Sequence, residues 1–126
     1  MELRKDSMDR ANPILFCWGS EQIGRNRFIN QYVDSIVSDM DSTKELVITG
    51  ISQVKEYASE TGFFLADARA SNIQRLFNER DSTLHILVGT EILDTVSFIF
   101  DSCYVAHRIE IRSHASKLND QNKIIH

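Results

Sequence analysis

Two hydrophobic periodicities alternate along the chain, and this alternation constrains the fold more than any other feature of the sequence. Continuous apolar runs, typical of strands buried on both faces of a sheet, occupy residues 14–18, 46–48, 63–66 and 84–88. Between these runs, apolar residues recur three and four positions apart, as they do on one face of a helix. We therefore expect helices at residues 28–37, 51–58, 73–77 and 92–100.

The order of these elements predicts a parallel sheet covered by helices on both faces. A fifth strand is expected from Tyr104, and its second half, residues 108–112, alternates polar and apolar side chains. Such alternation predicts an edge strand with one solvated face. Five strands separated by four helices imply right-handed crossovers. The prediction is therefore an α/β fold: a three-layer, doubly wound domain with a five-stranded parallel sheet.

Length and composition bound the domain organisation and the partners. The chain has 126 residues, which suits one domain at residues 13–126 after a flexible N-terminal arm at residues 1–12. Apolar residues make up 42% and charged residues 25%, as in ordinary globular proteins. The net charge of -4 argues against direct nucleic-acid binding, which depends on neutralising phosphates.

The location of the protein is predicted from its cysteines and its termini. Residues 1–6 have no apolar stretch behind their basic pair, so we expect no signal peptide, and no apolar run is long enough to cross a bilayer. Cys17 and Cys103 both lie in apolar segments, where reduced thiols are the expected state and a disulfide is the alternative. We therefore expect a cytoplasmic protein without a membrane partner.

One candidate site lies between the first strand and the first helix. Gly19 and Gly24 have the spacing of a phosphate-binding loop, and Arg25 stands where that loop has its lysine. Together with Asp67 after a later apolar run, this segment resembles the first domain of clamp-loader ATPase subunits. The alternative interpretation is a plain strand-to-helix turn, since Asn26 replaces the hydroxyl residue that binds magnesium.

A second candidate site uses the expected strand ends. Asp67 follows the run at residues 63–66, Thr90 follows the run at residues 84–88, and Tyr104 begins the fifth strand. In this pattern the chain resembles, over residues 13 to 125, the receiver domain of bacterial response regulators, which has a flavodoxin-like fold. The resemblance implies that Asp67 stands at the phosphoacceptor position, Thr90 at the switch hydroxyl and Tyr104 at the aromatic position.

The departures from the receiver pattern define the expected function. Gly19-Ser20 replaces the acidic pair that holds magnesium, leaving Glu21 nearby, and His107 stands near the position of a lysine. Magnesium offsets the charge of an incoming phosphoryl group, so without the acidic pair phosphorylation should be largely lost. The resemblance therefore implies a pseudo-receiver: a non-enzymatic signalling or transcription-regulating module of a two-component system, without cofactor or metal.

Such a module acts by contact with a protein partner, with an effector domain or with a second copy of itself. Receiver-like domains often dimerise through the face of the fourth helix and fifth strand, which would include Ile109, Ile111 and the exposed side of residues 90–100. The resemblance therefore implies a homodimer as one mode of action. The alternative function is a degenerate phosphate-loop nucleotide-binding module like a clamp-loader subunit of DNA replication.

Overall fold

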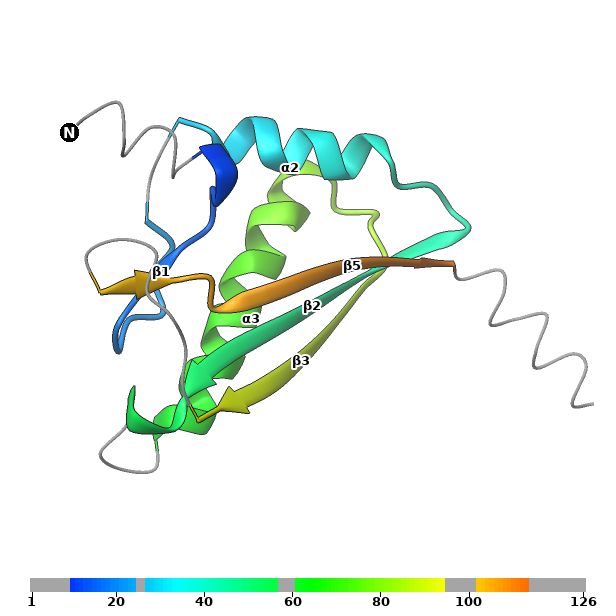
Figure 1. Cartoon of the computed structure of the whole chain (residues 1–126). Coiled ribbons are helices and arrows are strands. Elements are labelled where there is room, and N and C mark those ends of the chain that lie inside the picture. Colours follow the sequence, from blue (N-terminus) through cyan, green and yellow to red (C-terminus); the bar gives the residue numbers. More distant parts are fainter. Residues whose placement is uncertain (1–9, 25–26, 57–60, 95–101, 114–126) are drawn as a thin grey trace, which may run out of the picture.

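The structure, a computed structural model, describes residues 10–24, 27–56, 61–94 and 102–113 (Figure 1). Its two long helices are α2 (Ile29–Ser38) and α3 (Thr61–Arg80), and a 3₁₀ turn, η1, spans Val54–Glu56. The strands are β1 (Phe16–Cys17), β2 (Lys44–Gln53), β3 (Ile86–Leu93), β4 (Cys103–Tyr104) and β5 (His107–Ser113).

The sheet is mixed. In its three-stranded part, β2 lies at the centre, parallel to β3 and antiparallel to β5. The short strands β1 and β4 pair antiparallel as a second sheet. Only two residues separate β4 from β5, and the Ile51 N–H of β2 donates to the carbonyl of Ala106 between them, 2.9 Å away. The two sheets are therefore joined end to end along one stretch of chain.

The predicted five-stranded, all-parallel, doubly wound sheet is wrong. Among the described elements, β2 and β3 are the parallel pair, while β5 runs antiparallel to β2 and β1 runs antiparallel to β4. The fold is a small α/β fold with a partly antiparallel sheet. A receiver-like, flavodoxin-like architecture is therefore excluded for this chain.

Helix α3 is the main cause of the difference. The apolar run at residues 63–66, predicted as a strand, lies in the first turns of this 20-residue helix. Its fully buried positions Ala66, Ala70, Ile73 and Phe77 follow each other at steps of four, three and four residues, which is the period of one helix face. The prediction therefore assigned one continuous helix to two elements, a strand at residues 63–66 and a helix at residues 73–77.

Other expected elements differ in their bounds. The helix predicted at residues 28–37 is confirmed as α2, and the run at residues 84–88 contributes to β3. The helix predicted at residues 51–58 is wrong, because β2 continues to Gln53 and η1 follows. The helix predicted at residues 92–100 is wrong at its start, since Ile92 and Leu93 belong to β3, and residues 95–101 lie outside the described part.

The last strand is at a sheet edge, as predicted, because the strand order is β3-β2-β5. The arm predicted at residues 1–12 lies outside the described residues up to position 9.

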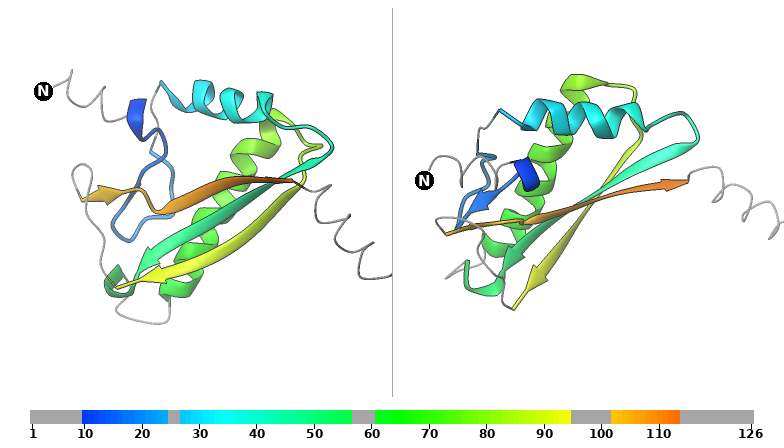
Figure 2. Two further views of the ribbon diagram at one scale, coloured as in Figure 1. Left: turned by 45° about the vertical axis from the view of Figure 1, so that its right-hand side comes forward. Right: turned by 45° about the horizontal axis from the view of Figure 1, so that its top comes forward.

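Gly50 lets α3 approach the sheet closely. A Cβ atom at Gly50 would stand 1.9 Å from the Ala66 carbonyl oxygen and 2.8 Å from the Ala70 nitrogen. The helix backbone therefore passes directly over β2, and α3 lies along one face of the sheet in every view (Figure 2). The short distance between the helix and the strand requires glycine at position 50 and small side chains, such as Ala66 and Ala70, on the helix.

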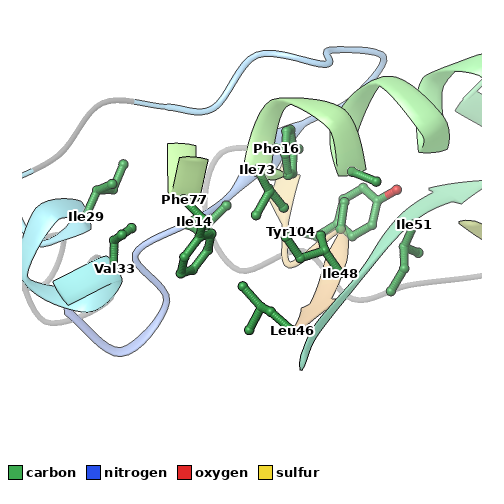
Figure 3. Packing of buried hydrophobic residues seen from close by; sticks show 12 residues of the cluster. Ile14, Phe16, Ile29, Val33, Leu46, Ile48, Ile51, Ile73, Phe77 and Tyr104 are labelled. Atoms are coloured by element: carbon green, nitrogen blue, oxygen red, sulfur yellow. The ribbon is translucent and has the colours of Figure 1, made fainter. Parts of the chain in front are cut away.

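The core lies between α2, α3 and the sheet. Leu46 and Ile48 of β2 pack with Ile73 and Phe77 of α3, and all four are fully buried (Figure 3). Helix α2 adds its buried face, and Phe16 of β1 and Tyr104 of β4 close the cluster at the other end. This last contact places the short β1–β4 sheet against the same core as the long strands.

Candidate functional site

The structure separates most residues of the predicted receiver pocket. Asp67 is exposed on α3, and Thr90 is exposed in the middle of β3 rather than after a strand end. Glu21 is exposed in the loop after β1, where its carbonyl accepts a hydrogen bond from Asn72 Nδ2 at 2.7 Å. Because the pocket depended on the carboxyl ends of neighbouring parallel strands, the mixed sheet removes its geometric basis.

A different cluster forms around Arg69, whose side chain is 0% exposed. Arg69 lies on the inward face of α3, one residue before Ala70, and its guanidinium carbon stands 5.2 Å from the centre of the Phe16 ring and 5.4 Å from that of Tyr104. These two rings, one from β1 and one from β4, provide an apolar and weakly attractive surface for a cation.

Every N–H group of the Arg69 guanidinium has an acceptor within the protein. Nε donates to the Ser20 carbonyl at 2.8 Å. Nη1 donates to the Ile51 carbonyl and the Tyr104 hydroxyl, both at 2.9 Å, and to Glu56 Oε2 at 2.9 Å. Nη2 donates to Glu56 Oε1 at 2.7 Å and to the Cys17 carbonyl at 3.2 Å. The cation therefore ties the loop after β1, the end of β2 and β4 to α3.

Glu56 is the counter-ion of Arg69, and its side chain is also 0% exposed. Besides the two-pronged contact with Arg69, it accepts the Tyr104 hydroxyl on Oε2. The backbone N–H of Gln53 donates to Oε2 at 2.8 Å, and that of Gly19 donates to Oε1 at 3.0 Å. A buried carboxylate with this many donors is stable in its charged form.

The surroundings change the acidity of two groups in this cluster. Burial alone would raise the pKa of Glu56, but the hydrogen bonds from Arg69, Tyr104 and the two backbone N–H groups outweigh it and lower the pKa. Burial, followed by the hydrogen bond to Glu56, raises the pKa of the Tyr104 hydroxyl. Near neutral pH the cluster therefore holds a carboxylate, a guanidinium and a neutral phenol.

This arrangement acts as a buried structural tie. With all of its N–H groups engaged, the Arg69 guanidinium has no donor to offer a ligand in this conformation. The phenol donates to a carboxylate that already accepts several hydrogen bonds. The cluster thus holds four segments of the chain together around one charge pair: residues 17–20, residues 51–56, α3 and β4.

Sequence reasoning missed Arg69 and Glu56. Arg69 stands three residues after Ala66 and four before Ile73, so it belongs to the buried stripe of α3. A cation inside an apolar stripe is a signal for a buried ion pair. The predicted strand at residues 63–66 hides this signal, because it separates Ala66 from the helical stripe to which Arg69 belongs.

Two residues of the predicted receiver pocket, Tyr104 and His107, lie in or beside this cluster, as does Gly19 of the predicted phosphate loop. Gly19 has φ of +72°, a left-handed conformation that favours glycine, and places its N–H on Glu56. His107 begins β5, and its ring contacts the edge of Phe16 at 6.4 Å between ring centres. Among the described residues, His107 Nδ1 is a buried polar atom without a hydrogen-bond partner. Burial lowers the pKa of His107 to about 4.

The alternative phosphate loop does not have the expected shape. The Gly19 N–H is occupied by Glu56, and the Gly24 N–H points to the Leu15 carbonyl at 3.4 Å. Helix α2 begins at Ile29, so the second glycine is not at the start of the helix. Arg25 lies outside the described residues.

The two cysteines form a disulfide between Cys17 and Cys103, so the prediction of two reduced thiols is wrong. These residues stand opposite each other in the β1–β4 pair, where side chains of neighbouring strands lie close enough to be bridged. The bond closes a loop between residues 86 positions apart in sequence.

Other features of the described chain are modest. In these residues no group of three or more histidine, cysteine or acidic side chains is arranged to hold a metal ion. A shallow depression of about 430 Å³ lies between the turns that precede β2 and β3, lined by Lys44, Asp81 and His85 among others. None of the helices in the described ranges has both the length and the apolar character needed to cross a membrane.

In comparisons with known proteins, the chain matches no protein-family model, no curated protein and no solved structure.

Proposed function

We propose that this chain is a non-catalytic interaction module that binds an extended polypeptide segment along the edge of β3. The observation that carries the proposal is the exposure of this strand. β3 is an outer strand of the three-stranded sheet (Figure 1). Val88 on this strand is 45% exposed, and Leu87 and Ile92 are each 38% exposed. Large apolar side chains on an outer strand edge favour the addition of another strand.

The two edges of the sheet differ in a way that supports this proposal. On β5, the edge strand at the other side, Arg108, Glu110 and Arg112 alternate with apolar residues. Charged side chains on an edge strand discourage pairing with other chains. Glu91 is the one charged residue of β3, and Arg108 contacts its carboxylate at 2.6 Å. Its charge is thus offset within the sheet.

The test uses a soluble probe strand. A fluorescently labelled peptide with the sequence of residues 86–93, flanked by lysines, is titrated with the protein, and binding is followed by anisotropy. We expect saturable binding and selective shifts of the β3 backbone amide signals in NMR spectra. The variant Thr90→Pro, which removes one backbone N–H from the outer edge, should bind much more weakly.

The control is Thr83→Pro, placed before β3 in the turn at residues 81–84, which should leave peptide binding unchanged if the protein remains folded. Absence of binding to the folded wild-type chain would overturn the proposal, and shifts confined to β5 would move the site to the other edge.

The signalling or transcription-regulating role implied by the receiver resemblance stays a prediction, and the fold correction leaves it without architectural support. The nucleotide-binding alternative also stays a prediction. A thermal shift with magnesium and ATP that is abolished by Arg25→Ala would favour it over the interaction module.

We also infer from the Cys17–Cys103 disulfide that the protein works in an oxidising compartment. This replaces the cytoplasmic location expected from reduced thiols. Maleimide labelling of the unfolded protein, after isolation from its source without reductant, should find no free thiol. Labelling of two thiols in the isolated protein would contradict this inference and favour a cytoplasmic location.

A further inference from the structure

We propose that the partner of the β3 edge is the β3 edge of a second copy of this chain, paired antiparallel about a two-fold axis through Thr90. This inference rests on the proposed function, since it names the strand that the edge accepts. Its evidence is the order of residues along β3, the direction of the backbone groups and the exposure of the apolar side chains.

The backbone groups at the outer edge can be assigned from the pairing with β2. The Leu46 N–H donates to the His85 carbonyl at 2.8 Å, while Leu46 stands opposite Ile86. In a parallel ladder the residues before and after the opposing residue make the hydrogen bonds. His85, Leu87 and the alternate residues after them therefore face β2, and Val88, Thr90 and Ile92 direct their N–H and C=O groups outward.

The sequence of β3 is symmetric in chemical character about Thr90. Leu87 and Val88 precede Gly89, and Ile92 and Leu93 follow Glu91, so two apolar residues stand at equal distances on each side. If two copies pair antiparallel with Thr90 opposite Thr90, Val88 meets Ile92 of the second copy and Leu87 meets Leu93 of the second copy. Every exposed large apolar residue of the strand then gains an apolar partner.

The outward backbone groups fit the same register. Pairs that exchange both N–H···O=C bonds in an antiparallel ladder must both point outward, and this holds for Thr90 with Thr90 and for Val88 with Ile92. Gly89 and Glu91 form the pair between them, where glycine leaves room for the carboxylate that Arg108 neutralises in its own sheet. Backbone direction thus permits this register, and side-chain character favours it.

The neighbouring registers are worse matched. Centring the axis on Gly89 sets Val88 against Thr90 and Leu87 against the charged Glu91. Centring it on Glu91 brings two glutamates directly opposite each other, which is unfavourable, and sets Val88 against Asp94. Of these three registers, the Thr90 register alone sets both Leu87 and Val88 against apolar residues.

A dimer of this kind extends the sheet to β5-β2-β3-β3-β2-β5. The interface is isologous, because the same strand is used by both copies, so association closes at two chains and does not continue into a fibre. It covers the β3 edges and leaves at the rims the β5 edges with their alternating charges. This differs from the dimer face expected from the receiver resemblance, which used Ile109 and Ile111.

The experiment is a charge-pair exchange read by sedimentation equilibrium on the full chain over a wide concentration series. The wild type should pass from monomer to dimer. Val88→Lys alone and Ile92→Glu alone should each weaken association. Because each change occurs twice in a symmetric dimer, about a fivefold loss per pair becomes roughly 25-fold. The variant that combines Val88→Lys with Ile92→Glu sets a cation opposite an anion of the second copy, twice, and should recover most of the association.

Recovery in the double variant is specific to the Thr90 register, because positions 88 and 92 are four residues apart on one extended strand and are too distant to pair within a chain. Two controls accompany the series. Ile111→Lys, an exposed change on β5, should leave the dimer intact, and circular dichroism should show that each variant is folded. Amide exchange at Val88, Thr90 and Ile92 should slow as the wild-type concentration rises.

The outcomes separate this inference from the proposed function. A wild type that stays monomeric but binds the peptide at β3 overturns the dimer and leaves the interaction module standing. A dimer that Val88→Lys does not weaken, or that Ile111→Lys disrupts, overturns the inference because another surface is used. A dimer weakened by both single changes and not recovered in the double variant overturns the Thr90 register.

Discussion

Arg69 and Glu56 form an ion pair that is buried away from solvent. The pair stabilises the fold only while both charges are present. Removing one member of such a pair leaves the other charge buried and uncompensated, which costs more than the pair contributes. Here the carboxylate also accepts the N–H groups of Gly19 and Gln53. The loss of Glu56 therefore affects several segments at once.

We expect Glu56→Leu to lower the free energy of unfolding by about 3–5 kcal/mol, because the Arg69 cation loses its counter-charge. Glu56→Gln should cost less, because its amide oxygen still accepts a hydrogen bond. Urea denaturation measures both. Glu79→Gln, an exposed change at the end of α3, is the control and should stay within about 0.5 kcal/mol of the wild type. Equal stability of Glu56→Leu and the control would contradict a stabilising role for the Arg69–Glu56 ion pair.

His107 should make the protein less stable in mild acid. Its pKa is lowered to about 4 in the fold, against about 6.5 in the unfolded chain, so below pH 6.5 the unfolded chain takes up a proton that the folded one does not. The stability should fall between pH 6.5 and 4 by about 3 kcal/mol from this group. Urea denaturation across this range measures the loss.

His107→Phe, which keeps a ring beside Phe16, should remove this part of the acid sensitivity. His85→Gln, a change at an exposed side chain, keeps the buried imidazole and should retain it. An unchanged pH profile in His107→Phe would show that other groups cause the loss, foremost Glu56, whose ion pair weakens as pH falls through its lowered pKa.

At the scale of elements, the crossing of α3 over β2 depends on the absence of a side chain at Gly50. The contact that a Cβ atom would make is with backbone, at the Ala66 carbonyl, and backbone within a helix cannot move aside alone. A side chain at this position would force the strand and the helix apart, and the buried core between them would lose its close packing.

We predict that Gly50→Ala lowers the free energy of unfolding by at least about 2 kcal/mol, whereas Gly89→Ala changes it by less than about 1 kcal/mol. Gly89 is the matched control, because it lies on β3 and a Cβ atom there meets nothing within 4 Å. Urea denaturation of the two variants provides the comparison. Similar losses at both positions would contradict a specific role for the helix contact at Gly50.

The elements also show where sequence patterns succeed. The stripe that predicted α2 is local and unbroken, so its period alone was sufficient. β2 was predicted at residues 46–48 but extends to Gln53, because its later residues pair with β3 over a ladder that reaches Leu93. The partner strand, more than the residues themselves, determines where β2 ends.

At the scale of the whole molecule, the disulfide joins two strands of two residues each, which are too short to be stable alone. Closing a loop between residues 86 positions apart removes much of the freedom of the unfolded chain. In the chain-entropy model this stabilises the fold by roughly 4–5 kcal/mol, an upper value.

Reduction should therefore lower the melting temperature and the urea midpoint, and Cys17→Ser combined with Cys103→Ser should reproduce the loss. Thermal denaturation with and without reductant measures the effect. In the double variant, reductant should change nothing, which separates the bond from other actions of the reagent. A wild type with the same midpoint in both conditions would contradict a stabilising role for the bond.

Local residue patterns correctly predict the features that depend on neighbours in the chain: the amphipathic face of α2 and the edge position of the last strand. They do not predict that residues 63–66 are helical, that β5 runs antiparallel or that Arg69 is the centre of the buried cluster. The physical reason is distance along the chain. The partners of Arg69 lie 13 to 52 residues away, so no local period records them. The β3 edge combines both kinds of information. The symmetric order of its residues can be seen in the sequence, whereas its exposure follows from the strand order of the mixed sheet.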